Sequence, residues 1–385
     1  MKVIHIGNMA GDSYNNVNFL RTMGIEADLV IDPKSHVTEH PEWNKGEFDG
    51  EVAEWAPNWE KMSVAEYVRP PWVRYSQLGV SLRPRGLVST LRRFNLLVRD
   101  YDIIQAAVLE PINCFLSGVK PYIAYSKGSD LRDVPFENTL RGKLMTLALK
   151  SASKVFITNP DTLSAGKRLG LSQAVYMPFI VDEDVYKPAR SAFRETLERL
   201  YDFDFLVGNP SRQDWGDKGN DKLIRAFARL VKEEQASALL AMVSWGIDLD
   251  RSKQLVKEMG IVDRVTWFPI MNKQKLVKFY NASDIIFDHV NLQSYGTTPL
   301  EAMACEKPVI AKLPSKDIVE FCWGHDIPPL IDVQSEEQIL QILKEFHGDK
   351  CLREKAGRDS REWVIRHHNW RLVVDKQIEA YSSIA

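Results

Sequence analysis

The chain has 385 residues, enough for two domains of ordinary size. Its hydrophobic fraction of 44% and its charged fraction of 26% are normal for a globular protein. The net charge of −2 provides no basic field for nucleic acid, and the 4 cysteines form no C-x-x-C pair or metal-like cluster. A nucleic-acid-binding protein and a disulfide-rich secreted domain are therefore excluded, and a reducing compartment is favoured.

No apolar stretch approaches the about 18 residues that a membrane-spanning helix requires. The first residues, MKVIHIGNMAG, lead directly into a strand-like segment and do not resemble a signal peptide. We expect a cytoplasmic protein that contacts a membrane, if at all, as a peripheral protein.

Short apolar runs alternate with amphipathic stretches along the whole chain. Strands rich in Val, Ile and Phe that are separated by helices predict parallel sheets covered on both faces. The candidate strands divide evenly between the two halves and are too many for one open sheet, so we predict two doubly wound α/β domains. The expected strands are 2–6, 27–31, 102–107, 122–126, 154–158 and 174–177, then 203–207, 238–243, 264–268, 284–287, 308–311 and 330–332.

The loop after the first expected strand, residues 7–13, contains Gly7 and Gly11. Glycine allows the backbone to approach a ligand closely, so Gly11 is a candidate binding residue. The G-x-G-x-x-G pattern is absent, which argues against a dinucleotide fingerprint.

A long polar segment, residues 33–77, interrupts the alternation and contains Trp43, Trp55, Trp59 and Trp72. Long irregular stretches inside compact domains are usually functional or mobile. Tryptophan faces pack against sugar C–H groups, so one interpretation is a loop on the acceptor side of a sugar site. The other is a loop pinned to its own domain by aromatic anchors, and the sequence favours neither.

A basic stretch follows, in which several arginines between residues 83 and 99 stand beside leucines and valines. Such a stretch could face an anionic membrane, but an ordinary amphipathic surface helix is the preferred interpretation. Farther along, MPFIVDEDVYKP at residues 177–188 places two prolines around an acidic turn and is the expected seam between the domains.

The strongest chemical signal is FLVGNPSRQDWGDKGNDKLIRAFARL, residues 205–230. A strand is expected to end at Gly208, a loop then presents Arg212 and Lys218, and Gly219 leads into a helix. A helix start is an anion site, and Arg212 can donate two hydrogen bonds to phosphate while Lys218 adds a compact charge. The alternative is a solvated loop with two unrelated cations.

The second signal is QSYGTTPLEAMACEKPVIA, residues 293–311. Here Pro299 fits the first helical position, Thr298 the N-cap and Glu301 the third position, which together predict a capping box. In the functional interpretation Glu301 instead accepts hydrogen bonds from ribose hydroxyls. Gly296 and Thr297 would bring backbone amides close to a sugar or a phosphate.

With these motifs the chain resembles a family 4 glycosyltransferase of GT-B fold, a group of retaining enzymes that use nucleotide sugars. The resemblance rests on the loop with Arg212 and Lys218, the seam at 177–188 and the stretch GTTPLEAMACEKPVIA. The turn SWGID (244–248) and the strand start NASDIIF (281–287) also match. The resemblance covers 205–311 well and the N-terminal half more loosely.

The chain departs from the family pattern at two positions. The family usually has two glutamates around the donor sugar, and Glu301 matches the second while Gln293 occupies the first. In YSKGSDLRD (125–133), Lys127 stands where the family commonly has histidine. Asp130 and Arg132 remain candidates for acceptor or phosphate contacts, with a helix-capping aspartate and a surface arginine as the alternative.

The resemblance implies two Rossmann-like doubly wound domains that face each other across a cleft. Residues 1–182 would form the acceptor-side domain, residues 183–365 the nucleotide-sugar-binding domain, and residues 366–385 a helix crossing back to the first. The implied partners are a nucleotide-sugar donor and a sugar-containing acceptor, without nucleic acid. No cofactor is expected, and the DFD, DLD and DED tripeptides are too common by chance to predict a metal.

The implied reaction is retaining transfer, in which Arg212 and Lys218 stabilise the leaving diphosphate. The alternatives are a GT-B epimerase or phosphorylase, and a sugar-binding GT-B protein without catalysis. The expected catalytic residues are Arg212, Lys218, Glu301 and Asp130. The expected donor-binding residues are Gly11, Gly208, Ser244, Trp245, Phe268, Gln293, Tyr295, Gly296, Thr297 and Thr298.

Overall fold

The computed structural model describes residues 1–48, 52–59, 64–65, 67–78, 84–292 and 296–385. The chain forms two compact units, Met1–Ile180 with Trp370–Ala385, and Val181–Asn369. The second unit begins two residues before the expected boundary. The last segment joins the first unit at Trp370 rather than at 366, because helix α15 (Lys350–His368) continues to His368.

The first unit is built on a parallel sheet with strand order β5-β2-β1-β6-β7-β8-β9. Helix α1 (Asp12–Thr22) packs against the last helix, α16 (Trp370–Ser382), where the rings of Phe19 and Trp370 stack with centroids 4.6 Å apart. The strands are β1 (Lys2–Ile6), β2 (Glu26–Ile31), β5 (Val73–Tyr75), β6 (Ile103–Ala107), β7 (Tyr122–Ser126), β8 (Lys154–Ile157) and β9 (Ala174–Tyr176). The other helices are α2 (Pro41–Lys45), α3 (Pro84–Val98), α4 (Pro111–Ser117), α5 (Ser129–Arg132), α6 (Leu140–Ser151) and α7 (Leu163–Leu169), and β3 (Glu47–Phe48) pairs with β4 (Val64–Ala65).

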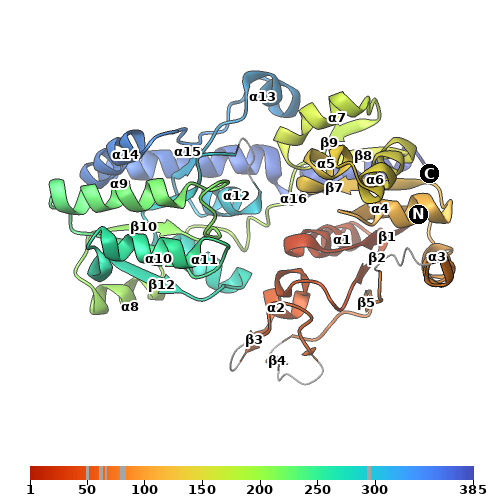
Figure 1. Ribbon diagram of the computed structural model, residues 1–385, viewed down its shortest axis with the longest axis horizontal. Helices are drawn as coiled ribbons and strands as arrows, with labels where there is room; N and C mark the ends of the chain where they lie inside the picture. The colour runs from red at the N-terminus through yellow and green to blue at the C-terminus, as the bar shows by residue number, and fades with distance from the viewer. Residues whose placement is uncertain (49–51, 60–63, 66, 79–83, 293–295) are drawn as a thin grey trace. The chain divides into compact units, whose positions relative to one another are not determined.

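The second unit is built on a parallel sheet with strand order β12-β11-β10-β13-β14. The predicted apolar face of α9 (Asn220–Glu233) is confirmed, since Leu223, Ile224, Phe227 and Leu230 are fully buried in the core. Figure 1 shows α9 beside α14 (Glu336–Gly348). The strands are β10 (Phe205–Asn209), β11 (Ala238–Val243), β12 (Val265–Phe268), β13 (Ile285–His289) and β14 (Val309–Ala311). The other helices are α8 (Ala192–Leu200), α10 (Leu249–Glu258), α11 (Lys273–Ala282), α12 (Thr297–Ala304) and α13 (Lys316–Trp323).

The predicted equal division of strands is wrong: within the described residues the two sheets have 7 and 5 strands. The additional strand, β5, pairs with β2 from within the polar Trp-rich segment, where no strand was expected. The expected strand at 330–332 forms only an isolated bridge between Ile310 and Ile331. Pro328 and Pro329 precede it and have no N–H to extend the ladder.

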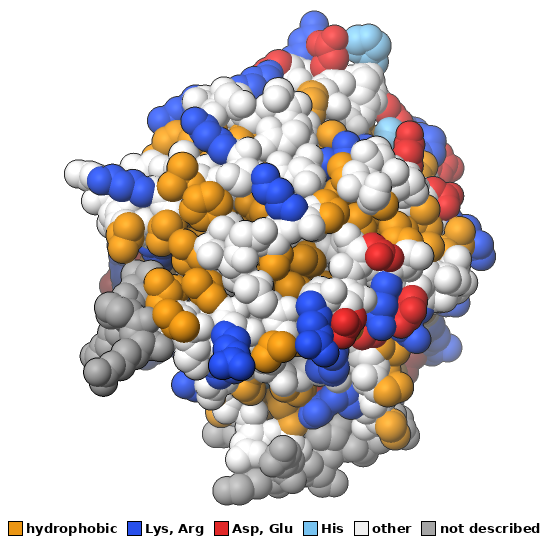
Figure 2. Space-filling view, turned by 90° about the vertical axis from the view of Figure 1, so that its right-hand side faces the viewer, with side chains coloured by type: hydrophobic (Ala, Val, Ile, Leu, Met, Phe, Trp, Pro, Cys, Tyr) orange, Lys and Arg blue, Asp and Glu red, His pale blue; other side chains and the backbone are white. Residues whose placement is uncertain are grey.

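The basic stretch before the third strand of the first half forms α3. This helix buries Phe94 and Val98 and exposes Val88 and Leu96, so it is amphipathic, as predicted. Figure 2 shows apolar side chains lying among Lys and Arg side chains on one face of the molecule. Among the helices that the structure describes, none combines the length and apolar character needed to cross a membrane.

Candidate functional site

The order of strands in the second sheet defines a point where ligands commonly bind. The chain starts the sheet at β10, adds β11 and β12 on one side, and then adds β13 and β14 on the other. In open α/β sheets a crevice opens outside the carboxyl ends of the strands where the direction of winding reverses. The loops that follow β10 and β13 begin with residues 210–219 and 290–292 and leave the sheet at this reversal.

Backbone hydrogen bonds fasten the loops at this edge to one another. The N–H of Gln213 donates to the carbonyl of Trp245 (2.7 Å), and the N–H of Val290 donates to the carbonyl of Lys218 (3.1 Å). Gly246 has a φ of +111°, and a Cβ there would lie 2.4 Å from the carbonyl oxygen of Gln213. The turn that follows β11 therefore requires glycine in order to close on the loop that follows β10.

Arg212 lies in the loop after β10 and is already paired with acidic side chains. Its guanidinium contacts the carboxylates of Asp214 (3.1 Å) and Asp217 (2.5 Å), and its side chain is 39% exposed. A phosphate would therefore compete with these two carboxylates for the same fork of donors. The ion pair with Asp217 is a weak competitor because both of its side chains are exposed, at 39% and 43%.

Lys218 is held by Asp288, a residue that sequence reasoning missed. The Lys218 Nζ lies 3.1 Å from Asp288 Oδ1, and the Asp288 carboxylate also contacts Ser211 and His289. Burial raises the pKa of Asp288, but the charges of Lys218 and His289 outweigh burial and hold this pKa well below its usual value. The sequence signal that could have revealed Asp288 was an aspartate and a histidine directly after the buried strand segment Ile285–Phe287.

The predicted capping box at the start of α12 is wrong. The helix begins at Thr297 with Gly296 at the N-cap, and the cap has no side-chain hydrogen bond. Pro299 is therefore the third helical residue, where its missing N–H still costs no helical hydrogen bond. Glu301 is therefore the fifth helical residue, two positions beyond the third position from which a side chain reaches the N-cap N–H.

Glu301 instead forms a buried cluster with side chains from other elements. Its Oε1 lies 2.5 Å from Lys273 Nζ and its Oε2 accepts from the Tyr280 hydroxyl at 3.1 Å. The Lys273 Nζ also lies 3.4 Å from the Thr297 hydroxyl, while Tyr280 and Thr298 are linked through their side chains. Burial and the Glu301 charge raise the pKa of Tyr280 well above its usual value. This cluster fixes the start of α12 against α11.

The remaining predicted residues of the second unit have different environments. Gly208 lies within β10, and a Cβ there would come within 2.5 Å of Ser283 Oγ, so the packing at this position requires glycine, and its donor contact stays a prediction. Ser244 and Trp245 form the turn after β11, where the Ser244 N–H donates to the carbonyl of Phe268 (2.7 Å). Gln293 and Tyr295 lie outside the described residues.

In the first unit Gly11 leads into a buried charged cluster. Gly11 is in the left-handed region (φ +79°) at the start of α1, and the next residue is Asp12. The buried Asp12 carboxylate accepts from the Tyr125 hydroxyl (2.6 Å) and pairs with Lys127, whose Nζ lies 3.4 Å from the centroid of the Tyr125 ring. Burial lowers the pKa of Lys127, although Asp12 opposes that shift. Asp12 was missed because nothing in the loop sequence links it to Lys127.

Asp130 is buried beside this cluster. Its Oδ1 accepts from the Lys127 N–H at 2.8 Å, and burial raises its pKa to about 6. Arg132 is paired with Asp161 at 2.5 Å. Asp130 therefore holds the backbone at Lys127, and Arg132 is a partly exposed member of an ion pair.

Part of the second unit is similar to a known protein family. Residues 212–363 match the family model described as Glycosyl transferases group 1. The D-inositol 3-phosphate glycosyltransferase of Rhodococcus opacus is 35% identical over 100 residues, which are 24% of this chain and 22% of that protein. The mannosylfructose-phosphate synthase of Agrobacterium fabrum is 24% identical over 236 residues, or 59% of this chain and 52% of that protein. The chain thus spans about a fifth to a half of the length of these relatives.

Solved structures extend the likeness to the whole fold. The structure of HepE from Anabaena in complex with UDP has a TM-score of 0.71 at 16% identity and covers 100% of both chains. Sucrose-phosphate synthase from Thermosynechococcus elongatus has a TM-score of 0.70 at 18% identity and covers 100% of this chain and 99% of that one. The predicted fold class, with two Rossmann-like α/β domains of the GT-B type, is confirmed.

Proposed function

We propose that the protein is a glycosyltransferase that moves a sugar from a nucleotide-sugar donor to an acceptor hydroxyl. The observation that carries the proposal is that the matched family region, 212–363, contains the loops that meet at the reversal of the second sheet. Anabaena HepE, whose fold is similar, has been solved in complex with UDP and with UDP-glucose. These complexes support a nucleotide-sugar donor for this chain as well.

In the proposed mechanism the second unit stabilises the leaving diphosphate. As the bond from the anomeric carbon to oxygen breaks, negative charge grows on the phosphate oxygens. Arg212 exchanges the carboxylates of Asp214 and Asp217 for phosphate oxygens, and Lys218 adds a positive charge that Asp288 keeps in place. The acceptor hydroxyl attacks from the face that the diphosphate leaves and passes its proton to a phosphate oxygen, so the configuration is retained. No protein nucleophile takes part.

Glu301 has a second role in the proposal. Its carboxylate, oriented by Lys273 and Tyr280, accepts hydrogen bonds from the ribose hydroxyls of the donor. Gly296 and Thr297 at the start of α12 contribute backbone amides to the same nucleotide.

The proposal is tested by thermal shift with UDP-, GDP-, ADP- and dTDP-sugars, followed by donor hydrolysis without acceptor. A ligand that binds only the folded state raises the melting temperature by mass action. We expect one nucleotide class to raise it and the same donor to be hydrolysed slowly. Arg212→Ala should slow this hydrolysis, because it removes a positive charge that stabilises the leaving diphosphate. Its control is Arg225→Ala, which removes an equal charge from α9 outside these loops.

A sugar-binding GT-B protein without catalysis is the second candidate function. The observation that favours it is that both candidate cations are paired with carboxylates in the structure. Stabilisation by a nucleotide sugar without any release of free nucleotide would support this candidate and contradict the transferase.

A further inference from the structure

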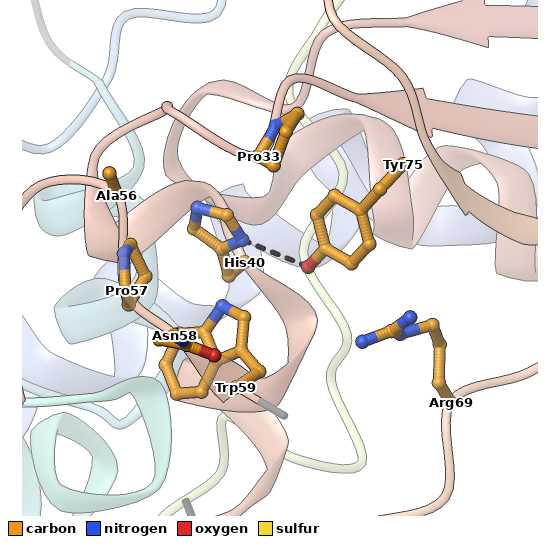
Figure 3. Close-up of a pocket in the computed structure, with 8 residues that line it drawn as sticks. All are labelled: Pro33, His40, Ala56, Pro57, Asn58, Trp59, Arg69 and Tyr75. Carbon is orange, nitrogen blue, oxygen red and sulfur yellow. Dashed lines mark hydrogen bonds between the residues drawn. The ribbon is translucent and has the colours of Figure 1, made fainter. Parts of the chain in front are cut away.

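The Trp-rich segment of the first unit encloses a cavity of about 330 Å³. Its walls are Pro33 and His40 after β2, residues 56–59, and Arg69 and Tyr75 (Figure 3). Tyr75 ends β5, and Pro33 follows β2, to which β5 is paired in parallel. The cavity therefore lies at the carboxyl edge of the first sheet, the edge where open α/β sheets bind ligands.

A chain of partly buried hydrogen bonds fixes two walls of this cavity. The buried Glu42 carboxylate accepts from the Tyr75 hydroxyl (2.7 Å) and from Arg69 Nε (2.6 Å). The Tyr75 hydroxyl also lies 2.8 Å from His40 Nδ1, and His40 Nε2 lies 3.2 Å from the Ser35 carbonyl oxygen. Both aromatic and charged walls are thus oriented before any ligand binds, which lowers the entropic cost of binding.

The lining combines flat apolar faces with polar edges. The Trp59 ring is 9% exposed and packs near His40, with ring centroids 5.5 Å apart, and two prolines add apolar surface. Asn58 is exposed and its amide can both donate and accept. In Figure 3 the Arg69 guanidinium points toward the space between Tyr75 and Trp59.

The charge of this lining is balanced inside the protein. Glu42 is 4% exposed in its side chain and pairs with Arg69, so the guanidinium offers hydrogen bonds without an uncompensated positive charge. A free carboxylate or phosphate in the cavity would lie close to Glu42 and would gain little from Arg69. The lining favours a neutral ligand with many hydroxyl groups.

We propose that this cavity binds one neutral sugar ring. The C–H faces of the ring pack against Trp59 and Tyr75, and its hydroxyls bond to Asn58 and Arg69. The volume is near the lower end of the about 300–1,000 Å³ of ligand pockets, which suits a single ring with its substituents. That this sugar is the end of the acceptor rests on the proposed function, whereas the binding itself does not.

The test measures binding of methyl glycosides to the full chain without donor, by isothermal titration. The panel contains methyl glucoside, galactoside, mannoside and N-acetylglucosaminide, with methyl glucuronide as the anionic comparison. We expect at least one neutral glycoside to bind, with about tenfold weaker binding in Asn58→Ala because one hydrogen bond to the ligand is lost. Trp59→Leu should abolish binding.

Trp55→Ala is the matched control, because Trp55 belongs to the same segment but is 66% exposed and does not line the cavity. It should bind the glycoside as the wild type does. Melting temperatures identify any variant that fails to fold. If Trp59→Leu fails to fold, the binding measured for Asn58→Ala decides the test, because Asn58 is exposed.

Three outcomes overturn the proposal: no neutral glycoside binds, only the glucuronide binds, or Asn58→Ala and Trp59→Leu both bind like the wild type. Nucleotide-sugar binding to the wild type is measured in parallel. If a nucleotide sugar binds and no glycoside does, the cavity proposal fails and the proposed function stands. If a glycoside binds and no nucleotide sugar does, the proposed function fails and the cavity proposal stands.

Discussion

The loops at the carboxyl edges of the two sheets are held in place by different physical means. In the second unit, backbone hydrogen bonds between loops hold Arg212, while the buried carboxylate of Asp288 holds Lys218. In the first unit, one buried carboxylate, Glu42, orients an aromatic ring and a guanidinium around a cavity. In our proposals the first arrangement presents cations to a diphosphate, and the second presents flat faces to a neutral sugar ring. The two edges therefore suit different chemical classes of ligand, and mutations can separate them.

The largest expected effect comes from the loop that follows β10. Lys218→Met should lower kcat by about 10²–10³ at saturating donor, because it removes a charge that stabilises the leaving group. It also deprives the buried Asp288 of the Lys218 charge, which lowers the melting temperature. The double variant Lys218→Met/Asp288→Asn should recover stability without recovering rate, as measured by calorimetry and steady-state kinetics. Recovery of both would make Lys218 a structural residue only.

Glu301→Gln should weaken donor binding by about tenfold. A neutral amide accepts hydrogen bonds from ribose less strongly than a carboxylate does, and a charged hydrogen bond is stronger by about 1.4 kcal/mol. The variant also leaves Lys273 without a charged partner, so a lower melting temperature is expected. Titration of the nucleotide sugar, normalised to the folded fraction, separates the two effects. Unchanged affinity per folded molecule would confine Glu301 to the cluster with Lys273 and Tyr280.

Glu42→Gln tests the other edge. The amide still accepts one hydrogen bond but loses the ion pair with Arg69, so we expect glycoside binding to weaken about fivefold, or about 1 kcal/mol. If the two edges are independent, Glu42→Gln lowers the affinity for the glycoside more than the affinity for the nucleotide sugar. Equal falls in the two titrations would mean that the two edges are not independent.

The smallest expected effect is a pH dependence of stability at His5. Burial and the charge of Lys127 lower the pKa of His5 from 6.5 to about 3. The unfolded chain therefore binds a proton between these values that the folded chain does not, so stability falls as the pH falls below about 6.5. Between pH 7 and pH 6 the loss is about 0.7 kcal/mol for one such group. In denaturant titrations at pH 7 and pH 6, the free energy of unfolding of His5→Gln should fall by about 0.7 kcal/mol less than that of the wild type. An identical fall in the two proteins would contradict the assignment.

The sequence predicted those features that depend on periodicity and on strand ends. The buried face of α9 and the position of Arg212 and Lys218 between a strand and a helix follow from spacing alone. Partners contributed by elements distant in the sequence could not be predicted, because Asp288 is 70 residues from Lys218 and Asp12 is 115 from Lys127. The start of α12 was misplaced because Thr298 and Pro299 have ideal types for a cap, while the tertiary contact of Glu301 with Lys273 sets the actual register. Likewise, β5 arises from its pairing with β2 rather than from its own composition.

The position of α16 has a consequence for how the protein is made. The Tyr381 ring is fully buried in the first unit, and its hydroxyl contacts His5 (3.1 Å) and Gln105 (2.7 Å). On the ribosome, residues 1–180 emerge well before residues 370–385, and all of the second unit is synthesised between them. Until α16 is synthesised, the nascent first unit therefore lacks the side chains that complete its core. The second unit, in contrast, can fold as one continuous segment. A chain released before residue 370 would contain a complete second unit and an incomplete first one.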